Sequence, residues 1–259
     1  MAKRKKKDAA VVSINSEHRK NIAKCIDFIG RVHSPWTVFS DFLAIAAITI
    51  SNNSDPCYIA TSKKVRDERE KRYLDIINQY DKREQKLLIS MFNELVEELQ
   101  SYCNGGESIH LTDVLGELFH ELDFNDKWKG QFFTPQHICD LMGKTAVGED
   151  DSFKTEIKEK GYFTVLEPCC GGGAMIYGVA NAMFESGMNF NKDALFFAND
   201  IDERCIFMTY IQCSLYGIPA IVQQKNSLTN QILSPPWFTP VFVWHSWRWN
   251  DLWKESAKK

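Results

Sequence analysis

The sequence lacks a Cys-x-x-Cys motif, a long apolar run and a dominant charge. It has eight cysteines but no Cys-x-x-Cys pair, and no secretion signal is evident. We therefore expect free thiols in a cytoplasmic protein, with neither disulfides nor a metal site. The apolar stretch from Val38 to Ile50 is too short to span a bilayer and contains Asp41. A buried helix explains this stretch, and we expect no membrane partner.

The charge is nearly balanced, with 31 lysines and arginines against 34 aspartates and glutamates. No global basic field indicates nucleic-acid binding, so any such contact has to be local. Residues 1–14 are locally basic and predict a flexible, solvated tail, with a phosphate-contacting arm as the alternative. One long charged helix is predicted over residues 62–85, and we interpret it as a solvated face rather than a DNA-binding face.

Changes of pattern along the chain predict three further segments. Apolar residues recur at spacings of three and four over residues 15–128, which predicts a helical N-terminal domain. Residues 129–223 alternate helix and strand signals, as βαβ units do. We predict helices over 136–146, 174–187 and 203–216, strands over 162–166, 194–199 and 219–223, and a charged connector over 149–161. Residues 224–259 hold five of the seven tryptophans and predict a packing flap, an oligomer contact or a nucleic-acid contact.

A glycine-rich turn follows the first predicted strand. Glu167 and Pro168 close this strand, and Gly171 and Gly173 flank a third glycine before the next helix. Strand, glycine turn and helix together bring backbone N–H groups close to a ligand. Ile176 stands where a dinucleotide fingerprint needs its third glycine, and no Gly-Lys-Ser/Thr follows for a P-loop. The remaining pattern suits a nucleoside with an amino-acid tail, whose cationic amine Glu167 can meet.

An acid ends the second predicted strand. Asp200 stands where a carboxylate can accept hydrogen bonds from both ribose hydroxyls of a nucleoside, and Asp202 is the second choice. A loop carboxylate can instead cap the helix that follows. This alternative fits Asp202 better than Asp200.

A further signal precedes the first helix of the alternating region. Thr134 is a good N-cap and Pro135 a good first helical residue. The helix is therefore predicted to begin with unpaired N–H groups that can hold a carboxylate. Phe132 and Phe133 are placed to form a wall of the same pocket. Alone this is an ordinary capped helix, but with the glycine turn about 35 residues later it indicates a ligand site.

Three parts of the chain together resemble motifs of the modification (methyltransferase) subunits of type I restriction systems. They are residues 130–135, residues 167–173, and Asp200 followed by residues 211–218. The chain also resembles the short N-6 DNA methylase proteins of phages and plasmids. The resemblance implies a Rossmann-like class I methyltransferase sheet, preceded by an α-helical N-terminal domain. It implies an adenine-N6 methyltransferase that uses S-adenosylmethionine, acts on DNA, and has a specificity subunit or a second copy as partner.

The resemblance also implies roles for single residues. Phe132 and Thr134 would lie against the methionine part of the cofactor. Glu167 and the glycines would hold the centre of the cofactor, and Asp200 would bind its ribose. These roles follow from the family and not from spacing alone.

The chain departs from the family at its catalytic motif. The family carries Asn-Pro-Pro-Tyr/Phe after the fourth strand, whereas this chain has Ser234, Pro235, Pro236 and Trp237. A serine version occurs among methyltransferases that act mainly on cytosine N4. The segment begins only eight residues after Asn226, which leaves too little chain for a buried fourth strand. A proline turn ahead of the tryptophan-rich tail is therefore the alternative interpretation.

The predicted sheet is also curtailed. A full class I sheet has about seven strands, and only 36 residues follow Gln223 for the last four. Four explanations stay open: an autonomous minimal enzyme, an enzyme completed by a partner, a cofactor-binding protein without turnover, or a piece of a longer protein. The leading hypothesis is an S-adenosylmethionine-dependent DNA adenine-N6 methyltransferase. The alternative is a non-catalytic, DNA-associated interaction protein that binds the same cofactor.

Overall fold

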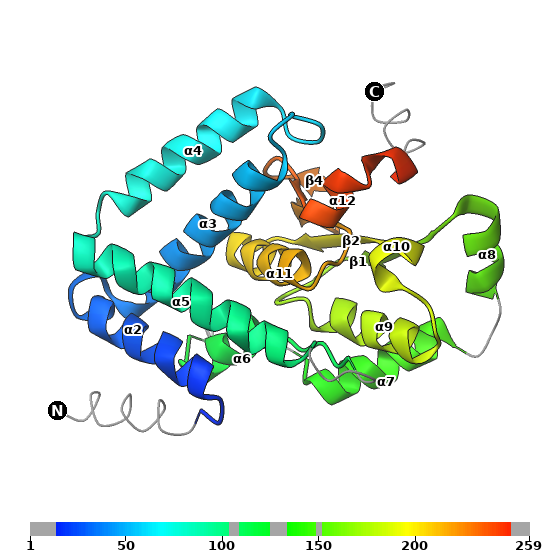
Figure 1. Ribbon diagram of the computed structural model, residues 1–259, viewed down its shortest axis with the longest axis horizontal. Coiled ribbons are helices and arrows are strands. Elements are labelled where there is room, and N and C mark those ends of the chain that lie inside the picture. The colour runs from blue at the N-terminus through cyan, green and yellow to red at the C-terminus, as the bar shows by residue number, and fades with distance from the viewer. Residues whose placement is uncertain (1–13, 104–108, 125–133, 149–151, 250–259) are drawn as a thin grey trace.

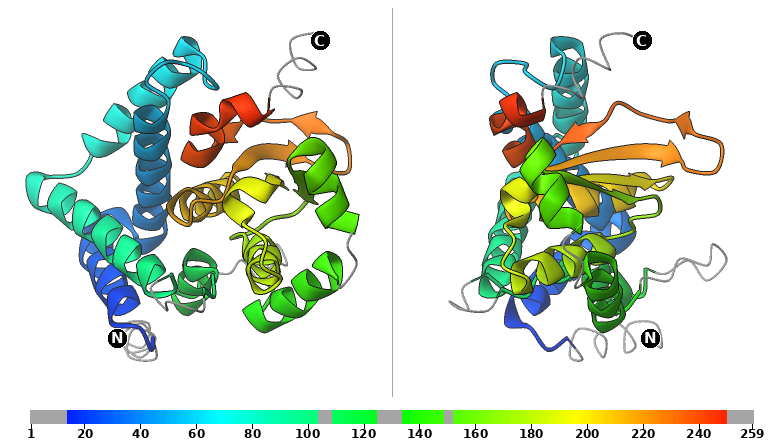
Figure 2. Two further views of the ribbon diagram at one scale, coloured as in Figure 1. Left: turned by 45° about the vertical axis from the view of Figure 1, so that its right-hand side comes forward. Right: turned by 90° about the vertical axis from the view of Figure 1, so that its right-hand side faces the viewer.

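The computed structural model describes residues 14–103, 109–124, 134–148 and 152–249. The N-terminal helices occupy one side of the molecule, and the sheet with its covering helices occupies the other (Figure 1). The helical side consists of α2 (Glu17–His33), α3 (Pro35–Ser54), α4 (Lys63–Ile77), α5 (Lys82–Ser101) and α6 (Val114–Glu121). Figure 2 shows α3, α4 and α5 as three sides of a triangle, and α2 packs along α5.

Polar N-cap residues precede three helices of this side. Ser16, Ser62 and Asp81 accept hydrogen bonds from backbone N–H groups in the first turns of α2, α4 and α5. Asp81 and Glu84 form a reciprocal capping box at the start of α5. The single long helix predicted over residues 62–85 is therefore wrong in extent, because the box starts a new helix shortly after α4 ends.

The other side alternates helices and strands. Its elements are α7 (Gln136–Val147), α8 (Ser152–Lys160), β1 (Phe163–Glu167), α9 (Ala174–Glu185), α10 (Phe190–Asp193), β2 (Ala194–Asp200), α11 (Glu203–Leu215), β3 (Ala220–Asn226), β4 (Gln231–Ile232), β5 (Trp237–Phe238), α12 (Pro240–Trp244) and the 3-10 helix Ser246–Trp249. The predicted helices and strands of residues 129–223 are confirmed to within a few residues at each end. The predicted connector is wrong for residues 152–160, where α8 forms and Phe153 packs on Phe163 with ring centroids 4.6 Å apart.

The sheet has three parallel strands in the order β1-β2-β3, and β4 and β5 both pair antiparallel with β3. Glu167 pairs with Ala198, and Asp200 pairs with Gln224. The carboxyl ends of the parallel strands therefore lie at one edge of the sheet, where α/β proteins bind ligands. Among the described residues only β2 pairs with β1. This mixed α/β sheet is compatible with a methyltransferase-like fold.

One hydrophobic core runs from α2 and α3 through α11 into the sheet. Three residues of the tail, Phe242, Val243 and Trp249, form a smaller cluster with Leu195 of β2. Trp249 is fully buried and meets the Tyr162 ring edge-on, with centroids 4.6 Å apart. The packing interpretation of the tail is thus confirmed for Trp249, while Trp253 lies outside the described residues.

The predicted limit near residue 14 adjoins a stretch outside the described residues, and the limit near residue 128 falls inside another such stretch. Both limits stay predictions. Within the described ranges, no single helix is both long and apolar enough to cross a membrane. Helices α2 and α3 meet that criterion only as a pair, and the two are bent by 114° where they join.

Candidate cofactor site

The turn between β1 and α9 requires glycine at two positions. Gly171 and Gly173 have φ angles of 54° and 102°, in the left-handed region that other residues rarely adopt. A side chain on Gly173 would also collide with Tyr177, because its Cβ would lie 2.4 Å from the Tyr177 hydroxyl oxygen. The Gly173 N–H donates to the Cys170 carbonyl at 2.8 Å and closes the turn. The result is a tight backbone loop at the carboxyl end of β1.

Asp200 is hydrogen-bonded to this turn. Its Oδ2 accepts from the Gly171 N–H at 3.0 Å, and its Oδ1 accepts from the Asp202 N–H at 2.9 Å. Burial raises the pKa of the Asp200 carboxyl, and these backbone hydrogen bonds act in the opposite direction. The structure thus joins two sequence-predicted parts of the site, at residues that are 29 positions apart.

Glu167 and Pro168 lie on the exposed side of the turn. The Glu167 Oε1 accepts from the Cys169 N–H at 3.0 Å, which leaves further lone pairs on the carboxylate for a ligand. The Pro168 carbonyl accepts from the Ser227 hydroxyl at 2.5 Å. Ser227 follows β3, so the β3–β4 hairpin, which projects from the sheet in Figure 2, reaches the turn across β2. Nothing in the sequence predicted this contact.

Asp202 is the N-cap of α11. Its Oδ1 accepts from the Arg204 N–H at 2.9 Å, and both carboxylate oxygens contact the Arg204 guanidinium. The guanidinium in turn lies 4.2 Å from the centre of the Trp36 ring of α3. The capping alternative for Asp202 is confirmed, and Asp200 is the acid bonded to the glycine turn.

Helix α7 begins at Gln136, within the predicted range, but its cap differs from the prediction. The helix begins at Gln136 with Pro135 as its N-cap residue, and no side chain caps it. Thr134 as N-cap and Pro135 as first helical residue are therefore wrong. The extended backbone of Pro135, with ψ at 139°, places the first helical residue one position later. Phe132 and Phe133 lie outside the described residues.

Two glycines bring α7 against α9, the helix that follows the turn. A Cβ on Gly143 would lie 2.2 Å from the Gly178 carbonyl oxygen, and one on Gly178 would lie 2.3 Å from the Cys139 carbonyl oxygen. The two backbones therefore touch without intervening side chains. The Gln136 side-chain amide donates to the Ala174 carbonyl at 3.4 Å. This packing places the start of α7 beside the glycine turn.

Two buried polar residues beneath the turn were not expected from the sequence. Gln212 of α11 is 0% exposed, and Asp113, which precedes α6, is 4% exposed. The Gln212 Nε2 donates to the Asp113 Oδ1 and to the Gly172 carbonyl, both at 2.9 Å. Gln212 lies within residues 211–218, which carry part of the family resemblance, and it is an amide in the mostly apolar buried stretch of α11.

The predicted catalytic segment is built into the sheet. Trp237 lies opposite Val222 of β3 and is 5% exposed. The Arg69 guanidinium of α4 lies 3.5 Å from the centre of the Trp237 ring. It also donates to the carbonyls of Pro236 at 2.9 Å and Pro235 at 3.5 Å. A base cannot stack on this ring in the observed arrangement. Ser234 forms a bend, and Pro235 and Pro236 have no regular secondary structure. The catalytic role of the segment stays a prediction.

Ser234 lies beside Gln223, in the middle of β3. Its carbonyl accepts from the Gln223 Nε2 at 3.5 Å, and the neighbouring Leu233 N–H donates to the Gln224 carbonyl at 2.9 Å. Strand β2 separates β3 from β1. Ser234 therefore lies beside β3, two strands away from β1, which the glycine turn follows.

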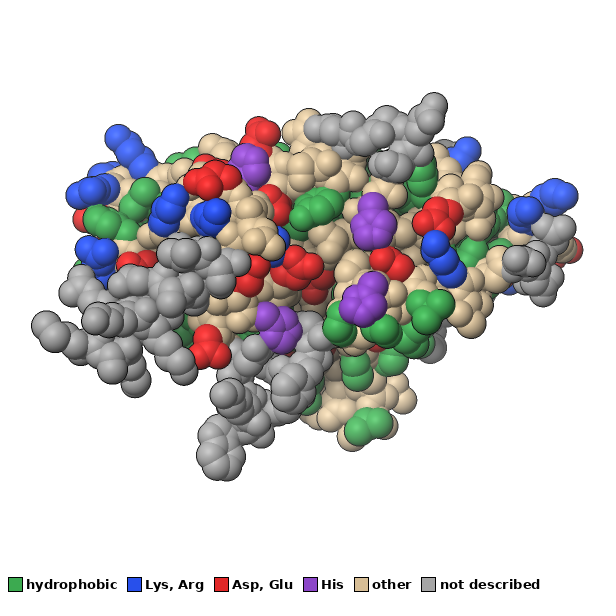
Figure 3. All heavy atoms as spheres, turned by 90° about the horizontal axis from the view of Figure 1, so that it is seen from below, with side chains coloured by type: hydrophobic (Ala, Val, Ile, Leu, Met, Phe, Trp, Pro, Cys, Tyr) green, Lys and Arg blue, Asp and Glu red, His purple; other side chains and the backbone are tan. Residues whose placement is uncertain are grey.

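Other surface features lie apart from the carboxyl edge of the parallel strands. A cavity of about 310 Å³ between α3, α4 and α5 has apolar walls, including Phe42, Tyr73 and Phe92, and contains no residue of the glycine turn. Acidic and basic side chains are interspersed on the face shown in Figure 3. In the described part of the chain, no three His, Cys, Asp or Glu residues are placed to hold a metal ion.

A glycine turn after β1 is hydrogen-bonded to Asp200, the acid that ends β2, at the edge of the sheet where α/β proteins bind ligands. The model of the N-6 DNA Methylase family matches residues 111–258, more than half of the chain. The chain belongs to this family of N-6 adenine DNA methylases, as its motifs predicted. Comparisons with curated proteins and with solved structures find no match.

Proposed function

We propose that the chain is an S-adenosylmethionine-dependent DNA adenine-N6 methyltransferase of the type I modification-subunit kind. The hydrogen bond between Gly171 and Asp200 carries this proposal, because it joins the glycine turn to the acid of the next strand. Family membership supports DNA methylation as the reaction. Three parallel strands connected through α9 and α11 support a Rossmann-like arrangement.

The groups at the carboxyl edge suit this cofactor chemically. Glu167 offers a carboxylate to the cationic amine of S-adenosylmethionine, and Asp200 offers lone pairs to its ribose hydroxyls. Gly171 and Gly173 have no side chain to obstruct a close approach of the backbone. Pro168 borders the same exposed surface.

Residues before α7 complete the proposed cofactor site. From the family resemblance we assign Phe132 and Thr134 to its methionine end, and we assign Phe133 to a wall of the same pocket. Thr134 precedes α7, whose Gln136 contacts Ala174 after the glycine turn. Asp202 takes part indirectly, since it caps α11 and its N–H donates to Asp200.

When bound, S-adenosylmethionine supplies an electrophilic methyl group. Direct transfer to an exocyclic amine requires alignment and a proton acceptor more than a strong base. We propose Ser234 as an acceptor for the target amine, with Pro235, Pro236 and Trp237 as the segment that carries it. Because Arg69 covers the Trp237 ring, DNA or a partner chain has to rearrange this segment or complete the site. A specificity subunit or a second copy of the chain would be such a partner.

Isothermal titration calorimetry with S-adenosylmethionine tests the first step. We expect the wild type to bind, and Asp200→Ala to bind at least about tenfold more weakly, because a ribose acceptor and a contact of the turn are lost. Asp193→Ala is the matched control, since the Asp193 carboxylate accepts only a local hydrogen bond, from the Asn189 N–H at 2.8 Å. No binding at millimolar cofactor, or equal affinities of wild type and Asp200→Ala, contradicts the proposal.

The second candidate is a non-catalytic, DNA-associated protein that binds S-adenosylmethionine, and the burial of Trp237 favours it. Incorporation of labelled methyl groups into adenine-containing duplex DNA separates the two candidates. Methylation that is lost in Ser234→Ala, with cofactor affinity unchanged, excludes the non-catalytic candidate. Cofactor binding without methyl incorporation excludes catalysis by the isolated chain.

A further inference from the structure

Residues 111–113 form a strap beside α9 and the end of α11. Side chains of these two helices hydrogen-bond to the backbone of the strap at successive positions. The Leu111 N–H donates to the Asn181 Oδ1 at 2.7 Å, and the Leu111 carbonyl accepts from the Asn181 Nδ2 at 2.9 Å. The Thr112 carbonyl accepts from the Tyr216 hydroxyl at 2.9 Å. Asp113 then ends the strap beneath the glycine turn. The family match begins at the first residue of this strap.

Asp113 and Gln212 form a buried polar pair directly under Gly172. The Gln212 Nε2 donates to both the Asp113 Oδ1 and the Gly172 carbonyl, and its Oε1 accepts from the Leu115 N–H at 3.1 Å. Both polar atoms of the amide are therefore used. A Cβ on Gly172 would lie 2.1 Å from the Asp113 Oδ2. The carboxylate thus occupies the space that any side chain at this position would need.

Buried donors set the direction of the peptide groups in the turn. The Gly171 carbonyl accepts from the Thr209 hydroxyl at 2.9 Å, and the Gly172 carbonyl accepts from the Tyr177 hydroxyl at 2.8 Å as well as from Gln212. In a planar trans peptide the N–H points opposite to the carbonyl. Because the Gly171 carbonyl is held toward α11, the Gly172 N–H is directed away from α11.

We propose that Asp113 and Gln212 are positioning residues, which hold the glycine turn in its ligand-binding conformation; this rests on the proposed function for the identity of the ligand. They act through Gly172 rather than by touching the ligand. A run of three glycines has many accessible backbone conformations, and ordering it only on binding would weaken affinity. The buried pair orders the turn before the ligand arrives.

Cofactor affinity separates positioning from general packing. Gln212→Leu removes the amide at similar size and Asp113→Ala removes the carboxylate, and we expect each to weaken S-adenosylmethionine binding about tenfold in calorimetry. Asp113→Asn keeps an oxygen acceptor for Gln212 and should retain the affinity within about twofold. Thr239→Val is the control, because Thr239 is 0% exposed and its hydroxyl bonds Ala220 and Ile218 at the opposite end of β3.

We expect Thr239→Val to lower the unfolding temperature without changing the cofactor affinity. The proposal is overturned if Gln212→Leu binds as tightly as the wild type, or if Thr239→Val weakens binding equally. If Gln212→Leu does not fold, Thr209→Val, which removes the hydroxyl hydrogen bonds to the Gly171 carbonyl and to the Cys170 Sγ, is judged by the same criteria.

Amide hydrogen exchange distinguishes failure of this inference from failure of the proposed function. A wild type that binds no S-adenosylmethionine would overturn the proposed function, but the order of the turn can still be measured. Faster exchange at residues 171–173 in Gln212→Leu, with no change in Thr239→Val, supports positioning. Unchanged exchange in Gln212→Leu overturns it.

Discussion

Asp113 is a buried carboxylate whose hydrogen bonds come from neutral groups, the Gln212 amide and the Gly116 N–H at 2.8 Å. Burial raises its pKa from 3.8 to about 6, and these hydrogen bonds oppose the rise. The folded protein therefore holds the Asp113 proton more tightly than the unfolded chain does. This contribution to stability is fully present below the unfolded pKa and is lost as the pH rises through about 6.

Asp113→Asn should remove this pH dependence. Relative to the wild type, we expect the free energy of unfolding of the variant to rise between about pH 4 and pH 7, by at most about 3 kcal/mol. Urea unfolding at a series of pH values measures the difference. Asp67→Asn, at an exposed position of α4, is the control and should show no such trend. A difference between Asp113→Asn and wild type that stays constant with pH would refute the assigned cause.

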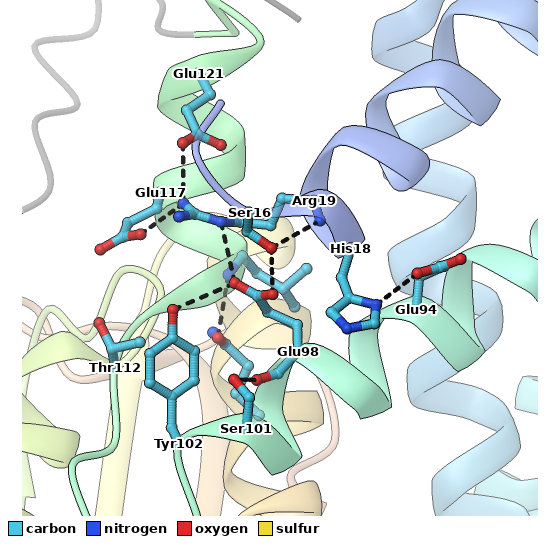
Figure 4. Close-up of polar contacts among 12 residues, drawn as sticks. Ser16, His18, Arg19, Glu94, Glu98, Ser101, Tyr102, Thr112, Glu117 and Glu121 are labelled. Atoms are coloured by element: carbon cyan, nitrogen blue, oxygen red, sulfur yellow. Dashed lines mark hydrogen bonds and ion pairs between the residues drawn. The ribbon is translucent and has the colours of Figure 1, made fainter. Parts of the chain in front are cut away.

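At the scale of elements, α6 is joined to α2 through Arg19 (Figure 4), and Asp113, which precedes α6, lies against Gly172 of the glycine turn. Arg19 of α2 lies among three carboxylates, at 2.7 Å from Glu117, 2.9 Å from Glu121 and 3.2 Å from Glu98 of α5. The side chain of Arg19 is only 10% exposed. Asp113 caps the opposite end of α6. Charged groups therefore hold both ends of a helix of eight residues.

Arg19→Met keeps an unbranched apolar stem but leaves the three carboxylates without their cation. The Arg19–Glu98 pair is buried, with side-chain exposures of 10% and 4%, and breaking it strands the Glu98 carboxylate, so we expect a loss of about 3 kcal/mol in the free energy of unfolding. Lys24→Met is the matched control, since Lys24 is 58% exposed and pairs with Glu17 at 3.5 Å. That change should cost at most about 0.5 kcal/mol. Equal losses in the two variants would show that the buried cluster contributes no more than a surface pair.

At the scale of the whole molecule, the helical side and the sheet share one core. Phe39 of α3 and Phe196 of β2 belong to the same continuous buried cluster. Polar contacts also cross between the two sides, such as the paired hydrogen bonds of Arg72 with Glu203 at 2.6 and 2.7 Å. A shared core of this kind couples the folding of the two sides.

We therefore expect one cooperative unfolding transition in scanning calorimetry, with equal van't Hoff and calorimetric enthalpies. Two separate transitions would contradict this expectation. They would favour the independent helical domain that was predicted over residues 15–128 from the sequence. Repeating the scan at several heating rates controls for irreversible unfolding.

The local features of the site were predictable because they depend on short stretches of chain. Glycines with positive φ after a strand, and acids at the end of the next strand, follow from backbone sterics and hydrogen bonding. The cap of α7 was predicted wrongly at Thr134, because the non-helical backbone of Pro135 makes Pro135 the N-cap residue. The role of Gln212 was hidden for another reason, since its partner Asp113 is 99 residues away.

The sequence by itself determined the family, the order of the main helices and strands, and the pairing of a glycine turn with Asp200, because periodicity and glycine chemistry act locally. Only the tertiary structure decided that β5 pairs antiparallel with β3 and that Trp237 lies beneath Arg69. It also decided that Asp113 and Gln212 support Gly172. These arrangements depend on contacts between distant segments, and no local pattern specifies which distant partner a buried side chain will meet.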